Sequence, residues 1–191
     1  MKRQDQKVHT RKRILDTAYR LYAAGGFSTP TNIIAQETGL SHGAIFVHFP
    51  TRESLQLKVL EKFTQEIGGK LHELTKIEAE ISELLYAHIA VLEEYESFYK
   101  NLISEISALP DETKTMLIAL HSVMSFHFGE LIEREKRNGR VKDIPLHMLF
   151  NTWLGLLHYY LQNSELFTSG ESVLKHRKKE LVENYLLLIS I

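Results

Sequence analysis

The sequence predicts an all-α fold of about nine helices. Apolar residues recur at the three- and four-residue spacing of an amphipathic helix through most of the 191 residues. No segment of useful length alternates apolar and polar residues as a half-buried strand does. Turn signals rich in glycine and proline are sparse and separate long helical patterns.

The composition is that of an ordinary globular protein of one or two small domains, with 43% apolar and 25% charged residues. The absence of cysteine excludes disulfides, thiolate metal sites and cysteine nucleophiles, and it favours a cytoplasmic protein. The sequence lacks a run of about 18 apolar residues, so we expect no membrane span. The basic start leads into no apolar signal region, so we expect no secretion signal.

Charge is distributed unevenly along the chain. Residues 1–62 carry ten Lys or Arg and five Asp or Glu, whereas the rest carries 13 and 19. A basic N-terminal third followed by an acidic remainder predicts that only the N-terminal part meets a polyanion.

Four helices are expected in the first third of the chain. The first seven residues are polar and expected to fray, and the amphipathic helix that follows ends at Gly25. Thr29 is predicted to be the N-cap of the second helix, with Pro30 at its first position. Pro50 ends the third helix, and Thr51 caps the fourth. The expected helices cover residues 8–24, 30–38, 41–49 and 52–72.

The second and third of these helices have the pattern of a helix-turn-helix, in AQETGLSHGAIFVHF over residues 35–49. Gly39 stands where the chain must turn, because a residue without a Cβ adopts positive φ at little cost. Leu40 can fill the angle between the helices, and Ser41 is a favourable N-cap. The second helix of such a pair enters the major groove of DNA. The alternative is an ordinary packed pair of helices.

The rest of the chain is also predicted to be helical. Pro110 is expected to open one helix, and the pair Asn138-Gly139 is typical of a helix end. The expected helices cover residues 81–95, 96–109, 110–136, 143–164 and 171–190.

With the helix before it, the motif resembles the TetR family of bacterial transcriptional regulators. The resemblance rests on RKRILDTAYRLYAAGGFSTPT and IIAQETGLSHGAIFVHFPTRESL, and it holds almost throughout residues 11–60. It implies a DNA-binding helix-turn-helix domain over residues 1–52 and an effector-binding and dimerisation domain over residues 53–191. The C-terminal part resembles the family only in length, number of helices and their placement.

The third helix can be oriented from its apolar residues. If Ile45 and Phe49 face the core, Gly43 and Val47 point outward, because successive residues are rotated by about 100°. Such small apolar residues suit thymine methyl groups better than bidentate hydrogen bonds to bases. We expect DNA contacts from this helix, from the start of the second helix and from the start of the fourth: Thr29, Thr31, Ser41, His42, Gly43, Ala44, Phe46, Val47, His48 and Arg52.

The family pattern often has Lys, Thr, Tyr and His where this chain has His42, Ala44, Phe46 and Val47. The helix therefore carries fewer strong hydrogen-bond donors, which predicts a greater part for DNA shape and phosphates. A basic arm, which either reaches an adjacent groove or is a solvated tail, comprises Lys2, Arg3, Lys7, Arg11, Lys12 and Arg13.

Aromatic and weakly polar residues on inward faces describe either a small-molecule pocket or a plain helical core. If they line a pocket, its ligand is a small hydrophobic or aromatic effector. The candidate ligand-binding residues are Tyr95, Phe98, Tyr99, Met116, His121, Met124, Phe150 and Trp153. We expect no cofactor and no metal, because the ten histidines are dispersed.

Two late segments, LFNTWLGLLHYYL and YLLLISI, are apolar on more than one side and so must be buried on more than one side. Burial against a second copy makes a homodimer, as the resemblance also implies, and Gly155 allows close approach. The alternative is that both segments cover the chain's own core. The candidate dimer residues are Trp153, Leu157, Tyr160, Leu161, Leu181, Tyr185 and Leu188.

These observations predict a regulator that binds double-stranded DNA as a dimer, and the resemblance makes it a ligand-responsive repressor. One alternative is a DNA-binding regulator without an effector, or an activator. A remote alternative is an all-helical enzyme that uses interior histidines such as His88, but the sequence has no nucleophile motif, phosphate loop or paired carboxylates.

Overall fold

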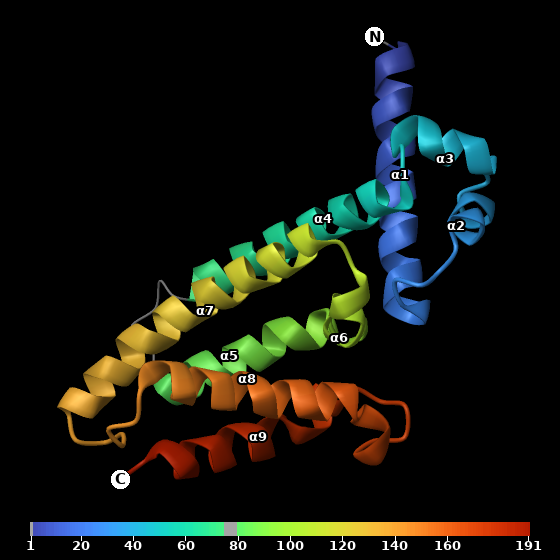
Figure 1. Ribbon diagram of the computed structural model, residues 1–191. Coiled ribbons are helices and arrows are strands. Elements are labelled where there is room, and N and C mark those ends of the chain that lie inside the picture. Colours follow the sequence, from blue (N-terminus) through green and yellow to red (C-terminus); the bar gives the residue numbers. More distant parts are fainter. Residues whose placement is uncertain (1, 75–79) are drawn as a thin grey trace. The chain divides into compact units, whose positions relative to one another are not determined.

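The computed structural model describes residues 2–74 and 80–191 (Figure 1). Over these residues the chain forms nine α-helices, two short 3₁₀ turns and a single isolated antiparallel bridge, so the predicted all-α class is confirmed. The α-helices are α1 (Lys2–Gly25), α2 (Thr31–Glu37), α3 (His42–His48), α4 (Arg52–Leu74), α5 (Ile81–Glu94), α6 (Glu96–Glu105), α7 (Asp111–Arg137), α8 (Leu146–Gln162) and α9 (Val173–Ile189). The 3₁₀ turns are Ile106–Ala108 and Ser164–Leu166.

The chain divides into two compact units. The first comprises Met1–Gln65 and Ser97–Leu117, and the second comprises Glu66–Glu96 and Ile118–Ile191. Helices α4 and α7 each contribute residues to both units. The expected domain boundary after residue 52 stays a prediction.

The core of the first unit is aromatic. Phe98 of α6 stacks on Tyr19 of α1 with ring centroids 4.5 Å apart, and it also contacts Phe27 and Phe63. The side-chain amide of Asn101 donates to the carbonyls of Tyr22 and Ala23 at the end of α1. These contacts make α6 a structural part of the same unit as the first three helices.

The helix boundaries of the first unit agree with the sequence except at two places. Helix α1 begins at Lys2, so the expectation that the first seven residues fray is wrong for the described ones. The cap of α2 is Pro30, and the Thr29 hydroxyl donates instead to the Gly26 carbonyl at 2.7 Å. Ser41 and Thr51 cap α3 and α4 as predicted, because their hydroxyls accept from backbone amides three residues later.

In the second unit, α9 packs against both α5 and α8 (Figure 1). Trp153, Leu157 and Tyr185 are fully buried, and the Tyr185 ring packs against Trp153 of α8 and Phe128 of α7. The Tyr185 hydroxyl donates to the Leu149 carbonyl at 2.7 Å, which satisfies the polar atom of a buried aromatic ring.

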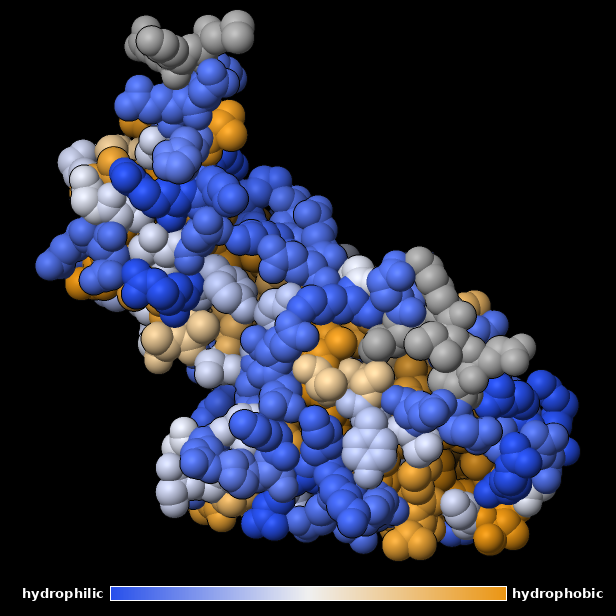
Figure 2. Space-filling view, turned by 180° about the vertical axis from the view of Figure 1, so that it is seen from behind, coloured by the Kyte–Doolittle hydropathy of each residue, from blue (hydrophilic) through white to orange (hydrophobic). Residues whose placement is uncertain are grey.

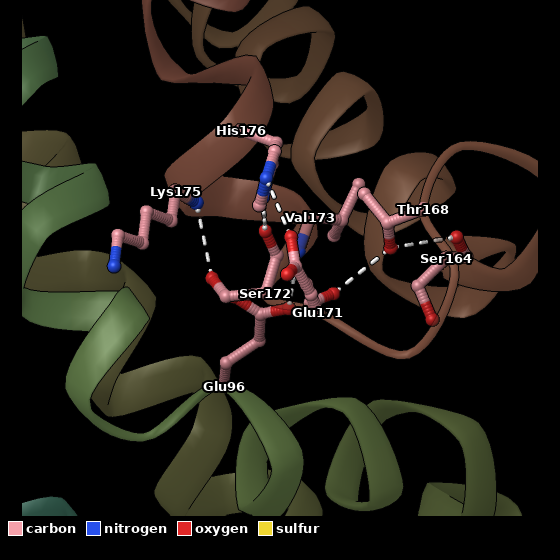
Figure 3. Close-up of polar contacts among 8 residues, drawn as sticks. All are labelled: Glu96, Ser164, Thr168, Glu171, Ser172, Val173, Lys175 and His176. Atoms are coloured by element: carbon pink, nitrogen blue, oxygen red, sulfur yellow. Dashed lines mark hydrogen bonds and ion pairs between the residues drawn. The ribbon is translucent and has the colours of Figure 1, made fainter.

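Helix α9 is capped from a distant part of the chain (Figure 3). The Glu96 carboxylate accepts from the Ser172 hydroxyl and from the amides of Val173 and Leu174 at 2.9 and 3.4 Å. The Ser172 hydroxyl in turn accepts from the Lys175 amide at 3.0 Å. A carboxylate here satisfies free amides and complements the positive end of the helix dipole.

Helix α7 is the one helix among residues 2–74 and 80–191 that is long and apolar enough to cross a membrane. Core helices of soluble proteins can have the same length and composition. Met124, Phe128 and Ile132 of α7 are buried, although only 28% of the most apolar part of this helix is buried. The absence of a membrane span therefore stays a prediction.

Candidate nucleic-acid interface

The outer face of α3 is the candidate DNA-reading surface. Ile45 and Phe49 are each 1% exposed, which fixes the inner side of this two-turn helix as the sequence predicts. Val47 is 73% exposed on the opposite side. Gly43 is also exposed, and a Cβ added there would meet nothing within 4 Å. The residues at the middle of the outer face of α3, Gly43 and Val47, are therefore small and apolar.

The flanks of this face carry larger side chains. Phe46 is 37% exposed, and its ring meets the His42 ring edge-on at 5.0 Å. Ala44 is half-buried, and its amide donates to the Ser41 hydroxyl. His42 is exposed in the first turn, where a ring nitrogen can reach a base edge or a phosphate.

The turn between α2 and α3 has the geometry that the motif requires. Gly39 has φ +63°, and the Leu40 amide donates to the Ala35 carbonyl at 3.0 Å. Leu40 is half-buried and Ile34 is fully buried. These contacts fix α3 against α2 as a helix-turn-helix pair.

Three predicted contact residues lie elsewhere than on the exposed face. Thr31 is only 9% exposed, and Thr29 is half-buried with its hydroxyl bonded to Gly26. Arg52 is half-buried, and its Nη2 donates to the Phe27 carbonyl at 2.6 Å. That bond directs the Arg52 guanidinium to the backbone of its own unit.

Sequence reasoning missed how the loop between α1 and α2 is held. The Glu105 carboxylate accepts from the amides of Phe27 and Ser28, each at 3.1 Å, and Gln56 donates to the Phe27 carbonyl. Gly26 has φ +79°, and a Cβ there would lie 2.2 Å from a Glu105 carboxylate oxygen. The glycine pair was the available signal, but its partner comes from a helix far along the sequence.

A second missed contact joins α1 to the end of α3. Arg11 Nη1 donates to the His48 carbonyl, and the guanidinium lies 4.1 Å from the centroid of the Phe49 ring. Burial lowers the pKa of His48, and the charges of Lys7 and Arg11 lower it further. His48 is therefore neutral at pH 7, with its Nδ1 buried and without a hydrogen-bond partner.

The comparisons with known proteins agree with this geometry. A family model described as "Bacterial regulatory proteins, tetR family" matches residues 14–59, which span α2, α3 and parts of α1 and α4. This N-terminal region of the chain is similar to the TetR family. Its candidate interface is the helix-turn-helix within the matched region.

Two Bacillus subtilis proteins match the N-terminal part, both described as uncharacterized HTH-type transcriptional regulators. YerO is 36% identical over 73 residues, which are 38% of this chain and 24% of YerO. YuxN is 40% identical over 53 residues, which are 27% of this chain and 18% of YuxN. The alignments thus span less than a quarter of each of these relatives.

Solved structures are similar over nearly the whole chain. A TetR-family regulator from Agrobacterium tumefaciens has a TM-score of 0.78 at 22% identity, over 97% of this chain and all of that one. A Saccharomonospora viridis protein in complex with choline also scores 0.78 at 22% identity, over 96% and 99%. PfmR from Thermus thermophilus scores 0.74 at 18% identity, over 92% and 97%. These likenesses show a common fold.

The candidate effector residues are divided between the two units. Phe98, Tyr99 and Met116 belong to the first unit, where Phe98 and Tyr99 are core residues. The other five belong to the second unit: Tyr95, His121, Met124, Phe150 and Trp153. Phe150 packs against Phe128, and Trp153 packs against Tyr185.

A histidine cluster lies within the second unit. Trp153 Nε1 donates to His88 Nδ1 at 3.0 Å, and the His121 and His158 rings are 5.7 Å apart. Burial lowers the pKa of His88 to about 3, with further lowering by His121 and His158. Burial also lowers the pKa of His121 to about 4. The cluster is therefore uncharged at neutral pH, and the sequence had not singled out His158.

Most candidate dimer residues are buried within one chain. Trp153, Leu157, Leu161, Leu181 and Tyr185 are at most 2% exposed, and Tyr160 is half-buried. Leu188 is 61% exposed. Other apolar side chains of α8 and α9 are exposed, namely Met148, Tyr159 and Leu187. Figure 2 shows apolar patches at the lower edge of the view, where Figure 1 draws α9.

Proposed function

We propose that this chain is a transcriptional regulator that binds a pseudo-palindromic operator as a homodimer and releases it when a small hydrophobic or aromatic effector binds. The observation that carries the proposal is the outward face of α3. Ile45 and Phe49 are buried while Gly43 and Val47 face solvent, within the region that matches the family. Such a helix can lie close to the floor of a major groove.

The chemistry of that face suggests how the operator is read. Gly43 keeps the helix close to the bases, and Val47 and Ala44 offer apolar contact to thymine methyl groups. His42 supplies a polar group in the first turn. Because strong donors are few, phosphates and DNA shape contribute much of the affinity, and binding falls steeply with salt.

Dimer formation is supported by the outward face of α8. Met148, Thr152, Gly155 and Tyr159 recur at spacings of four, three and four residues and are all exposed. A Cβ on Gly155 would meet nothing within 4 Å in the chain itself. Because glycine costs about 1 kcal/mol in a helix interior, its use at an open position suits close approach of a second helix. Leu187 and Leu188 of α9 extend the apolar surface.

The effector would act by population shift. It must bind better to the conformation that does not fit the operator, since only differential affinity moves the equilibrium. Helices α4 and α7 run from one unit into the other, so they can carry a change in the second unit to the first. The S. viridis structure contains choline, a small organic cation. For this chain the aromatic and neutral histidine side chains favour an uncharged or aromatic molecule.

A regulator without an effector, an activator and an enzyme are the competing functions, and we place the regulator in the cytoplasm with its DNA. Selection of bound fragments from a random duplex library by the full-length protein tests DNA binding directly. We expect an enriched inverted repeat whose half-sites are spaced for two major grooves. A library without enrichment, with no gel shift on any fragment, would reject the proposal.

The effector is tested separately, with the selected operator in hand. A set of uncharged, aromatic and cationic small molecules is screened for a shift in the thermal unfolding temperature and for release of the operator. A molecule that stabilises the protein and lowers operator affinity supports ligand-responsive repression. Failure of all classes favours a regulator without an effector.

A further inference from the structure

We infer that Arg11 of α1 is a positioning residue that fixes the end of recognition helix α3, whereas its neighbours Lys12 and Arg13 remain available to DNA phosphates. The inference rests on the proposed DNA binding and deepens it. It assigns different roles to residues that look alike in the sequence.

Arg11 makes two contacts at the same place. Its Nη1 donates to the carbonyl of His48, the last residue of α3, although the residues are 37 positions apart. Its guanidinium also covers the Phe49 ring, with 4.1 Å between the Cζ atom and the ring centroid. The planar guanidinium is suited to such a combination of hydrogen bond and stacking.

The end of α3 is where such a contact matters most. The last carbonyls of a helix have no partner within the helix, and the C-terminus carries partial negative charge. Helix α3 has only seven residues, so its own hydrogen bonds hold it weakly. Ile45 and Phe49 anchor its inner side, and Arg11 adds an anchor at its end.

The surroundings of His48 agree with this role. Its Nδ1 is buried without a hydrogen-bond partner, and its pKa is lowered by burial and by Lys7 and Arg11. A neutral imidazole lets the Arg11 guanidinium stay close without charge repulsion.

The neighbouring basic residues differ from Arg11. Lys12 and Arg13 are exposed on α1 and line a surface hollow with His9 and Asp16. Arg20 is bound to Glu37 of α2 at 2.9 Å. Exposed Lys12 and Arg13 are the residues free to approach a phosphate, while half-buried Arg11 is held against Phe49.

The test compares Arg11→Lys and Arg11→Met with the charge-matched variant Arg13→Met in the full-length protein. Affinities for the selected operator and for a mixed-sequence duplex are measured over a range of KCl concentrations. Both Arg11 variants are expected to lose about tenfold in the ratio of specific to non-specific affinity, as one charge-assisted hydrogen bond is lost. Their salt dependence should match the wild type. Arg13→Met should weaken both duplexes alike and lower the salt slope by about one.

A phosphate contact predicts the opposite result. Arg11→Met would then weaken both duplexes equally and reduce the salt slope by about one, and Arg11→Lys, which keeps the charge, would restore binding. That pattern would overturn the assignment.

Hydrogen exchange of the free protein supplies a readout that needs no DNA. In both Arg11 variants the α3 amides should exchange about tenfold faster than in the wild type, while the α4 amides remain unchanged. Unchanged exchange in α3 would overturn the assignment even if DNA binding holds. Failure of all duplexes to bind would reject the proposed function, and the exchange result would still decide the role of Arg11.

Discussion

On α3, some residues serve the fold and others are available for binding. Ile45 and Phe49 are buried in the core, whereas Val47 is 73% exposed and a Cβ on Gly43 would meet nothing within 4 Å. Exposed apolar residues on a short helix cost little and need no structural explanation by themselves. Their arrangement around a glycine on the outer face is what indicates a groove-reading surface.

Replacement of Val47 with Glu should abolish specific operator binding and leave the fold intact. A carboxylate at a 73% exposed position is well solvated, but on the operator it would face phosphates and base edges of like charge or polarity. Leu166→Glu is the matched control, because Leu166 is also 73% exposed and lies in the second unit. Gel-shift titration and thermal unfolding measure both variants. Operator affinity of Val47→Glu equal to that of Leu166→Glu would show that α3 does not enter the groove.

The histidine cluster makes stability depend on pH. Trp153 Nε1 donates a hydrogen bond to His88 Nδ1. If His88 Nδ1 were protonated, two hydrogen-bond donors would face each other in a buried site, which is unfavourable. The folded-state pKa values of about 3 for His88 and about 4 for His121 lie below the unfolded value of about 6.5. The unfolded chain therefore binds more protons between these values, and stability falls as the pH drops below about 6.5.

The variant His88→Asn tests this dependence. The Asn side-chain oxygen can still accept from Trp153, but the group no longer titrates. Urea unfolding between pH 7.5 and 5 should show a shallower loss of stability in the variant, by up to about 1.4 kcal/mol per pH unit. Parallel pH profiles for variant and wild type would assign the pH dependence to other groups.

Several helix ends in this chain are set by glycines and capping residues close by in the sequence, so these ends can be predicted from the sequence. Gly39 and Gly139 have positive φ, and Ser41 and Thr51 cap the helices that follow them. The sequence does not mark the N-terminal boundary of α1, because residues 4–9 are exposed and show no apolar periodicity. Thr29 was misjudged because a proline can cap a helix without a side-chain hydrogen bond.

Contacts between distant elements could not be read in the same way. The inward direction of Arg52, the Glu105 bond to the α1–α2 loop and the place of Arg11 all depend on which helices pack together. The sequence gives the type of each residue but not its partner. It therefore predicts the helix-turn-helix face well and the supporting contacts hardly at all.

The Glu96 cap of α9 is a long-range contact with a measurable value. Glu96→Ala removes the acceptor for the Ser172 hydroxyl and for two amides at the start of the helix (Figure 3). We expect a loss of about 1–2 kcal/mol in the free energy of unfolding. Glu96→Gln retains one acceptor oxygen without the charge and should lie between wild type and Ala. Equal stability of all three proteins in urea unfolding would show that water replaces the cap without cost.

For the whole molecule, the central question is which surface a second copy would cover. The sequence singled out the most apolar residues of α8 and α9, but most of them serve the chain's own core. Hydrophobicity alone cannot divide such residues between core and interface, because both are buried in the final assembly. In the proposed dimer, the surface left for a second copy on α8 and α9 is the exposed set Met148, Thr152, Gly155, Tyr159, Leu187 and Leu188.

Gly155→Leu is expected to weaken the dimer by at least about tenfold, because a bulky side chain would separate two closely packed helices. The isolated chain should be no less stable, since the position is open and leucine favours helix over glycine. Gly69→Leu is the matched control, an exposed helical glycine of α4 that also has open space around a Cβ. Light scattering with size-exclusion chromatography over a dilution series measures the dimer. If Gly69→Leu dissociates the dimer and Gly155→Leu does not, the second copy lies on another face. If only Gly155→Leu dissociates it, operator affinity should fall with it, because one recognition helix alone reads half a palindrome.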